Sequence, residues 1–197
     1  MPDKSLDKKY WDDRYLNGES SWDIGYVSPA LKAYIDQLPD KHISILIPGC
    51  GNAYEAEYLL QQGFTNITLV DISYVAAEAI KEKFSRYGGK LKVIHGDFFK
   101  LQEKFQLILQ QTFFCAIDPS LRKNYAEKMY DLLRQEGKLV GLFFDRDFED
   151  GPPFSGGKEE YMNLFAPLFD ILVMERAYNS IERRQGTELF VILKKGK

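Results

Sequence analysis

The sequence predicts an α/β fold in which a seven-stranded, mostly parallel, Rossmann-like sheet carries helices on both faces. Strand-like and helix-like segments alternate along most of the chain, and this order is typical of parallel strands joined by helices. The last two strand-like segments follow one another without a helix between them. Since two such strands can pair directly in opposite directions, we expect an antiparallel hairpin at one edge of the sheet.

The expected strands are short apolar runs rich in β-branched residues, bounded by polar turns. The expected helices begin after residues that favour helix N-termini, such as Ser28 and Ser73, and stop at glycines such as Gly63 and Gly137. These patterns place strands at residues 43–47, 67–71, 91–95, 105–110, 138–144, 168–175 and 188–194. They place helices at residues 29–38, 53–62, 73–88, 120–135 and 158–165, and loops at residues 150–157 and 177–186.

The composition is ordinary for a globular protein and disfavours a nucleic acid partner. The 26 basic and 29 acidic residues give a formal net charge of −3 without a basic stripe, so we expect no nucleic acid partner. Two cysteines, no export signal and no membrane-spanning stretch favour a cytoplasmic location with free thiols. With only two histidines, we expect no metal site.

No linker divides the chain, so residues 1–197 are interpreted as one domain. Residues 1–42 would form an aromatic lid and helices, and residues 43–197 the Rossmann-like core.

The strongest local motif follows the first predicted strand, where Gly49 and Gly51 enter a helix. Glycines at this point let the backbone turn tightly and let a ligand approach the main chain. A dinucleotide loop would carry a third glycine three residues after Gly51, and this chain has Tyr54 there. The motif therefore favours a ligand without a pyrophosphate and disfavours an NAD(P)-dependent oxidoreductase.

Two carboxylates follow the next two predicted strands. Asp71 ends the second strand, twenty residues after Gly51, where an acid can accept the ribose hydroxyls of an adenosine group. Asp97 follows the third strand, and its neighbour Phe98 could cover an adenine ring. Because these residues belong to the carboxyl ends of adjacent strands, the sequence predicts adenosine binding at that edge of the sheet.

Both tryptophans of the chain lie in the segment before the first strand, as Trp11 and Trp22, with Tyr15 between them. They would either anchor an N-terminal helix on the sheet or form a lid over the ligand. Aromatic faces attract cations, and a sulfonium methyl donor carries one, whereas NAD(P)H does not. The sequence leaves both interpretations open.

Five motifs in this order resemble the thiopurine S-methyltransferase family. They are Trp22-Asp23-Ile24-Gly25, Ile47-Pro48-Gly49-Cys50-Gly51, Val70-Asp71-Ile72-Ser73, Phe113-Phe114-Cys115-Ala116-Ile117-Asp118-Pro119 and Gly151-Pro152-Pro153-Phe154, and the resemblance extends over residues 10–194. The last two are similar to the plant-type halide and thiol methyltransferase branch.

The resemblance implies a class I methyltransferase that binds S-adenosylmethionine. Carried onto matching positions, Trp11 and Trp22 would meet the methionine end of the donor, and Tyr15 is expected beside them, where the halide branch has a third tryptophan. Gly49 and Gly51 would lie under the donor, and Asp71 would hold its ribose. Asp97 and Phe98 would meet the adenine, and Ile72 and Gln111 complete the expected donor site. At Gln110-Gln111 the thiopurine enzymes have an acidic and then a basic residue, and the halide branch has tyrosine at the position of Gln111 and of Phe154.

The resemblance further implies methyl transfer to a small soft nucleophile: a thiol, thiocyanate, bisulfide or halide. Tyr26, Phe113, Phe144 and Phe154 are the expected acceptor pocket, with residues 151–157 as a cover. Such a nucleophile needs little or no general base, and the sequence identifies no catalytic residue. The alternatives are a larger thiopurine-like acceptor, an O- or N-acceptor with Asp118, Asp145 or Asp147 as base, or a donor-binding protein without activity. Cys115 is interpreted as a small buried residue, and the protein as a monomer with a small-molecule acceptor.

Overall fold

The computed structural model describes residues 6–196 of the chain. Residues 1–5 and 197, which the expected domain includes, lie outside the described residues. Its strands are β1 (Ile45–Pro48), β2 (Ile67–Asp71), β3 (Leu91–His95), β4 (Phe105–Gln111), β5 (Leu133–Phe144), β6 (Phe169–Arg176) and β7 (Glu188–Lys195). They form one seven-stranded sheet in the order β3-β2-β1-β4-β5-β7-β6.

The direction of the strands divides the sheet into two parts. Strands β1 to β5 pair in parallel, whereas β7 runs antiparallel to both β5 and β6. The predicted parallel sheet with a C-terminal antiparallel hairpin is therefore confirmed.

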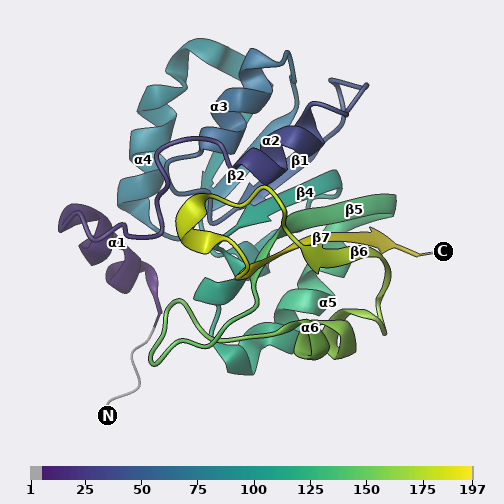
Figure 1. Cartoon of the computed structure of the whole chain (residues 1–197). Helices are drawn as coiled ribbons and strands as arrows, with labels where there is room; N and C mark the ends of the chain where they lie inside the picture. The colour runs from purple at the N-terminus through teal and green to yellow at the C-terminus, as the bar shows by residue number, and fades with distance from the viewer. Residues whose placement is uncertain (1–5, 197) are drawn as a thin grey trace.

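The helices are α1 (Lys8–Leu16), α2 (Pro29–Ile35), α3 (Tyr54–Gln61), α4 (Tyr74–Lys83), α5 (Arg122–Leu132) and α6 (Lys158–Phe165). Short 3₁₀ turns are η1 (Ser85–Lys90), η2 (Phe98–Lys100), η3 (Phe114–Ala116), η4 (Pro119–Leu121) and η5 (Glu182–Arg184). Figure 1 shows α2, α3 and α4 on one side of the sheet, α5 and α6 on the other, and α1 beside α4.

The two helical layers explain why the parallel strands are apolar at nearly every position. Successive side chains of a strand point to opposite faces, so a strand covered on both faces needs apolar residues throughout. Ile45 and Ile47 of β1 belong to the core under α2, α3 and α4. Leu46, between them, belongs to the core under α5 and α6.

Several sequence-based expectations about the helices differ from the structure. The helix expected at residues 120–135 ends at Leu132, because Leu133 already pairs with Phe105 as the first residue of β5. The helix expected at residues 73–88 is α-helical only to Lys83. Ser28 occupies the N-cap position of α2, but its side chain makes no capping hydrogen bond.

The parallel strands place the loops after β1, β2, β3 and β4 at one edge of the sheet, and these loops carry the expected ligand residues. Among residues 6–196, no helix combines the length and the apolar character that crossing a membrane requires.

Candidate active site

A cavity of about 890 Å³ lies at the carboxyl ends of these strands. Its floor is formed by the loops that follow β1 to β4, and the segment of residues 6–26 covers part of it. Residues of the loop after β5 close the other end, including Phe148, Pro152 and Pro153. The volume lies in the range of small-molecule sites, which are concave and mostly apolar with a few well-placed polar groups.

The glycine loop forms a tight floor for this cavity. Gly49 and Gly51 both have positive φ angles, 56° and 51°, which side chains rarely tolerate. A Cβ atom on Gly49 would lie 2.2 Å from Cδ2 of Phe113, and one on Gly51 would lie 3.3 Å from Oη of Tyr15. The backbone turn therefore favours glycine at both positions, and the close approach of the Phe113 ring adds a steric requirement at Gly49.

Asp71 is a buried carboxylate at the end of β2 that lines the cavity. Its Oδ2 accepts a hydrogen bond from the backbone N–H of Gly51 (3.2 Å), and its Oδ1 accepts one from the N–H of Ser73 (2.9 Å). Burial raises the pKa of Asp71, and these two backbone donors partly offset that effect. Each carboxylate oxygen keeps a second lone pair with which it can accept a ligand hydroxyl.

Asp97 and Phe98 follow β3 on the same side of the cavity. Oδ1 of Asp97 accepts a hydrogen bond from the N–H of Phe99 (2.9 Å) and thereby starts the turn η2. Phe98 is buried, and its ring meets that of Phe113 edge to face at 5.3 Å. An apolar ring beside a carboxylate is suited to a flat, amino-bearing heterocycle such as adenine.

The three N-terminal aromatic residues form one cluster that faces the cavity. Trp22 meets Trp11 edge to face at 5.7 Å and Tyr15 at 5.8 Å, and all three line the cavity. Burial raises the pKa of Tyr15, because desolvation disfavours its charged form. The cluster thus packs on itself as an anchor would, and it also presents aromatic surface to the ligand space as a lid would.

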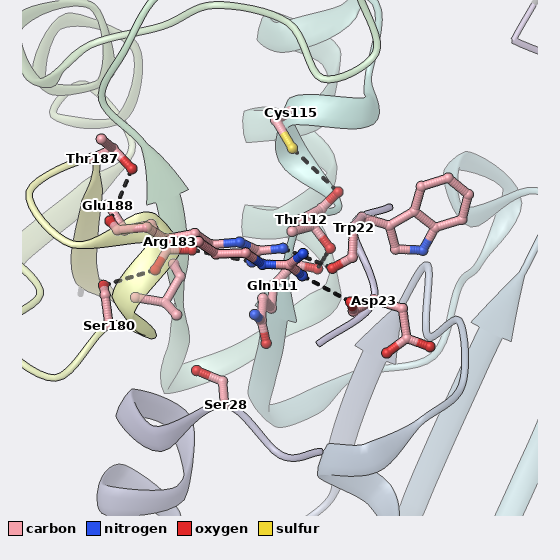
Figure 2. Close-up of polar contacts among 12 residues, drawn as sticks. Trp22, Asp23, Ser28, Gln111, Thr112, Cys115, Ser180, Arg183, Thr187 and Glu188 are labelled. Carbon is pink, nitrogen blue, oxygen red and sulfur yellow. Dashed lines mark hydrogen bonds and ion pairs between the residues drawn. The ribbon is translucent and has the colours of Figure 1, made fainter. Parts of the chain in front are cut away.

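A buried ion pair closes the wall next to Trp22. Arg184 and Glu188 are 6% and 3% exposed, and Nη1 of Arg184 lies 3.3 Å from Oε1 of Glu188. Nη2 of Arg184 donates to the carbonyl of Trp22 (2.7 Å), and Oγ of Ser180 donates to Oε2 of Glu188 (2.7 Å). In Figure 2, Ser180 and Glu188 lie on one side of the labelled Arg183, and Trp22 and Asp23 lie on the other.

Gln111 extends this network to the opposite wall. In the amide orientation that satisfies both neighbours, it donates to Oε1 of Glu55 (3.2 Å) and accepts from Nη1 of Arg184 (3.0 Å). Glu55 also accepts the backbone N–H of Ser28 (3.1 Å), and burial raises its pKa. The uncharged Gln111 thus lies between an anion and a cation, both of which line the cavity.

The acceptor end differs from its prediction at one residue. Tyr26, Phe113 and Phe144 line the cavity, but Phe154 does not. The ring of Phe154 folds back on Gly151, where an added Cβ would lie 2.2 Å from Cδ1 of Phe154, and its N–H donates to the carbonyl of Cys115 (2.7 Å). Pro152, Pro153 and Phe148 occupy the wall instead.

The side chain of Arg122, the first residue of α5, attaches the loop of residues 151–157 to this helix. Its side chain is 8% exposed, and its guanidinium donates to the carbonyl of Ser155 (2.7 Å) and pairs with Glu160 (2.5 Å). It also lies over the ring of Phe114, 5.1 Å from the centroid. This acceptor loop, residues 151–157, is therefore attached through the buried Arg122 at the start of α5 as well as through the hydrogen bond from Phe154 to Cys115.

Cys50 and Cys115 are buried and free, and both line the cavity. Burial raises the pKa of Cys115 to about 12, so its thiol stays protonated at neutral pH. We expect Cys115 to resist alkylation by iodoacetamide at pH 8 in the folded protein and to react after denaturation, as peptide mass spectrometry would detect. Rapid labelling of the native protein would show that the thiol is ionised or exposed.

The structure brings together nearly all of the residues that the sequence assigns to the site. Lining the cavity are Trp11, Tyr15, Trp22, Gly49, Gly51, Asp71, Ile72, Asp97, Phe98, Gln111, Tyr26, Phe113 and Phe144. The sequence did not point to Glu55, Arg184 and Glu188. Glu55 is far along the chain from the other two, which lie four residues apart, and none of the three belongs to a short motif. Of the expected alternatives for a base, Asp118 lines the cavity, whereas Asp145 and Asp147 do not.

The chain is similar in sequence to known proteins over most of its length. The family described as thiopurine S-methyltransferase matches residues 6–193. The chain is 30% identical to a probable thiol methyltransferase 2 from Arabidopsis thaliana over 90% of its own length and 81% of that protein. It is 29% identical to thiocyanate methyltransferase 1 from Brassica oleracea, over 94% and 84%.

Solved structures show the same fold. The 1,6-didemethyltoxoflavin-N1-methyltransferase of Burkholderia thailandensis, with bound S-adenosylhomocysteine, superposes with a TM-score of 0.77 at 20% identity, over 96% of this chain and 87% of that one. Magnesium protoporphyrin IX methyltransferase from Synechocystis gives 0.74 at 14% identity, over 98% and 100%.

Proposed function

Because the chain belongs to the thiopurine S-methyltransferase family, we propose that it transfers the methyl group of S-adenosylmethionine to a small soft nucleophile. The acceptor class comprises thiols, thiocyanate, bisulfide and halides. The chain is an S-adenosylmethionine-dependent methyltransferase of the class I fold. The observation that carries the acceptor proposal is a single cavity that joins the end lined by Asp71 and Asp97 to an aromatic end beside the buried guanidinium of Arg184.

The donor half of the cavity suits S-adenosylmethionine. Asp71 would accept the ribose hydroxyls, since it is buried and its described partners are backbone donors. Asp97 and Phe98 would meet the adenine, and Ile72 would pack beside it. Trp11, Tyr15 and Trp22 would surround the methionine end, where aromatic faces stabilise a desolvated cation by ~0.5–2 kcal/mol each. Gly49 and Gly51 would allow the donor to lie directly on the backbone.

The acceptor half suits a nucleophile that arrives as an anion. When bound, the donor supplies an electrophilic methyl group, and an attacking anion bonds to its carbon while the carbon–sulfur bond breaks and the electron pair stays on sulfur. No proton has to move, which agrees with a site where no residue stands out as a base. The guanidinium of Arg184 lies over the ring of Phe144 and, although Glu188 balances its charge, would offer N–H donors to an anion. Tyr26, Phe113 and Phe144 would exclude water. Alignment of two reactants can supply ~7–11 kcal/mol of the barrier.

The test is a turnover assay that follows S-adenosylhomocysteine release. Iodide, thiocyanate, bisulfide, an aromatic thiol and a thiopurine are supplied in turn, and we expect release with at least one of the first four. Release with the thiopurine alone would replace the small-nucleophile proposal by a larger acceptor. Donor binding without release for any of the five would favour an O- or N-acceptor or a protein without activity.

Replacement of Arg122 by lysine tests the acceptor loop. Lysine keeps the charge but cannot hold the Ser155 carbonyl and Glu160 at once with a planar fork. We expect the acceptor KM to rise about fivefold, which corresponds to about 1 kcal/mol, while the donor KM stays unchanged. Replacement of the exposed Lys123 by arginine is the matched control. Equal changes in both KM values would show that Arg122 supports the whole fold instead.

We further propose that the reaction takes place in the cytoplasm, on a small-molecule acceptor, within one domain that works as a monomer. The acidic balance of the chain and its two free cysteines support this setting. Residues 6–26 would serve as the cover of the donor site, whereas α2 packs into the core of the domain. Size-exclusion chromatography with light scattering checks the monomer, and a dimer mass would contradict it.

A further inference from the structure

We propose that Asp12 is a positioning residue that fastens helix α1 to the ribose site of the donor. The inference rests on the proposed function, because it concerns the donor that the cavity would bind. Helix α1 carries Trp11 and Tyr15, which face the cavity on the side of the glycine loop. The polar contacts of Asp12 lead from this helix directly to Asp71.

Asp12 is the one buried residue of α1, at 9% exposure. A helix that covers a protein core usually buries a stripe of apolar residues, and α1 instead buries a carboxylate. Since a buried charge is costly unless it is paired and hydrogen-bonded, this side chain must be held by specific partners. The attachment of α1 therefore depends on the groups that Asp12 binds.

These partners belong to the first turn of α4. Oδ1 of Asp12 accepts hydrogen bonds from Oγ of Ser73 (2.7 Å) and from the backbone N–H of Val75 (3.1 Å). Its other oxygen pairs with Nζ of Lys8, one helical turn earlier, at 2.5 Å. Lys8 and the two hydrogen bonds hold the pKa of Asp12 down to about 2 against the effect of burial. The carboxylate thus stays charged at any pH at which the enzyme would be assayed.

Ser73 connects this contact to the ribose site. Its side chain binds Asp12, while its backbone N–H donates to Oδ1 of Asp71 (2.9 Å). The other oxygen of Asp71 binds the N–H of Gly51, the glycine against which Oη of Tyr15 lies. A series of hydrogen bonds therefore connects the aromatic face of α1 to the carboxylate expected to bind ribose. It runs through Asp12, Ser73, Asp71 and Gly51. A donor held by Asp71 would find Trp11 and Tyr15 already in place over it.

A purely structural role makes a different prediction. Asp12 also lies at the N-terminus of α4, where a carboxylate stabilises the helix dipole. If that were its whole role, its loss would lower the melting temperature and leave donor affinity unchanged. The two roles are therefore separated by the affinity for S-adenosylhomocysteine, which needs no acceptor.

The experiment compares Asp12→Ala, Asp12→Asn and the parent protein. We expect Asp12→Ala to raise the Kd of S-adenosylhomocysteine about tenfold, the loss of roughly one hydrogen bond to a charged group. The KM of the donor should rise equally, with the acceptor KM unchanged. Asp12→Asn should recover most of the affinity, because its amide oxygen can accept from both Ser73 and Val75. Asp13→Ala is the matched control, since Asp13 lies on the same helix and its side chain is 52% exposed.

Calorimetry gives the Kd, and tryptophan fluorescence gives an independent signal, because both tryptophans of the chain lie in or just after α1. A lower melting temperature with an unchanged Kd for Asp12→Ala would overturn the proposal. If Asp12→Ala does not fold, hydrogen exchange of the Val75 amide in the parent protein distinguishes the two roles, measured with and without S-adenosylhomocysteine. Protection that rises on adding S-adenosylhomocysteine supports the attachment, and unchanged protection overturns it. Failure of the parent to bind S-adenosylhomocysteine would overturn the proposed function itself.

Discussion

Replacement of Asp71 by alanine is expected to raise the KM for S-adenosylmethionine about 100-fold or more. Hydrogen bonds to a charged group contribute about 1.5–3 kcal/mol each, and this buried carboxylate can accept both ribose hydroxyls. A 100-fold change corresponds to about 2.7 kcal/mol, which one or two such bonds supply. Initial rates at varied donor concentration give the KM directly. A KM within a few-fold of the parent value would show that the ribose lies elsewhere.

The conservative variant Asp71→Asn adds a second readout through pH. Burial raises the pKa of Asp71, so its carboxylate becomes protonated at a higher pH than an ordinary aspartate. Because the charged form is the better acceptor, donor affinity in the parent should fall as the pH is lowered through this raised pKa. Asp71→Asn should bind the donor weakly with no such dependence. A pH profile that is the same in both proteins would contradict the assignment.

Replacement of Arg184 by alanine is expected to cause the largest loss of stability, about 3–5 kcal/mol. The variant leaves Glu188 charged at 3% exposure with Ser180 as its remaining side-chain partner. It also removes the hydrogen bond to the carbonyl of Trp22, so the N-terminal segment loses an attachment to the core. Urea denaturation followed by circular dichroism measures the free energy of unfolding.

Two further variants make this expectation specific. Arg183→Ala removes the neighbouring exposed arginine, whose described hydrogen bond is to the carbonyl of Asp23, and should cost less than 1 kcal/mol. The double variant Arg184→Met with Glu188→Leu removes the charges together and should recover most of the stability. We expect turnover to stay low in the double variant, since the cation beside the acceptor space is gone. Full turnover in that variant would show that the ion pair is structural only.

Much of the fold could be predicted from the sequence because strands that are buried on both faces are apolar at nearly every position. Runs such as Ile45-Leu46-Ile47 must be apolar throughout, and α6 begins and ends where its prediction placed it. The end of α5 is harder to predict from the sequence, because Leu132 and Leu133 are both buried and suit a helix as well as a strand. Only the pairing of Leu133 with Phe105, a contact between distant segments, decides where the strand begins.

The donor half of the site was predictable for a related reason. Gly49, Gly51, Asp71 and Asp97 each lie at the end of a strand or within three residues after it, so topology alone places them at one edge of the sheet. The network of Glu55, Gln111 and Arg184 offers no such rule, because it depends on side chains meeting across the cavity. The loop at residues 177–186 looked polar and turn-like, yet Ser180 and Arg184 within it are buried. The sequence does not distinguish a polar residue that is buried and hydrogen-bonded from one that is exposed to solvent.

The position of β7 has a consequence for the order in which the fold can be completed during synthesis. β7 is the last strand in sequence, but it lies between β5 and β6, so β6 has no neighbour in the sheet until β7 has been made. Until then β5 is the exposed edge of the nascent sheet, and unpaired strand edges promote aggregation. Since β7 also carries Glu188, Arg184 gains its counter-ion only at that stage. A growing chain therefore closes its sheet and completes the wall of its cavity in the same late step.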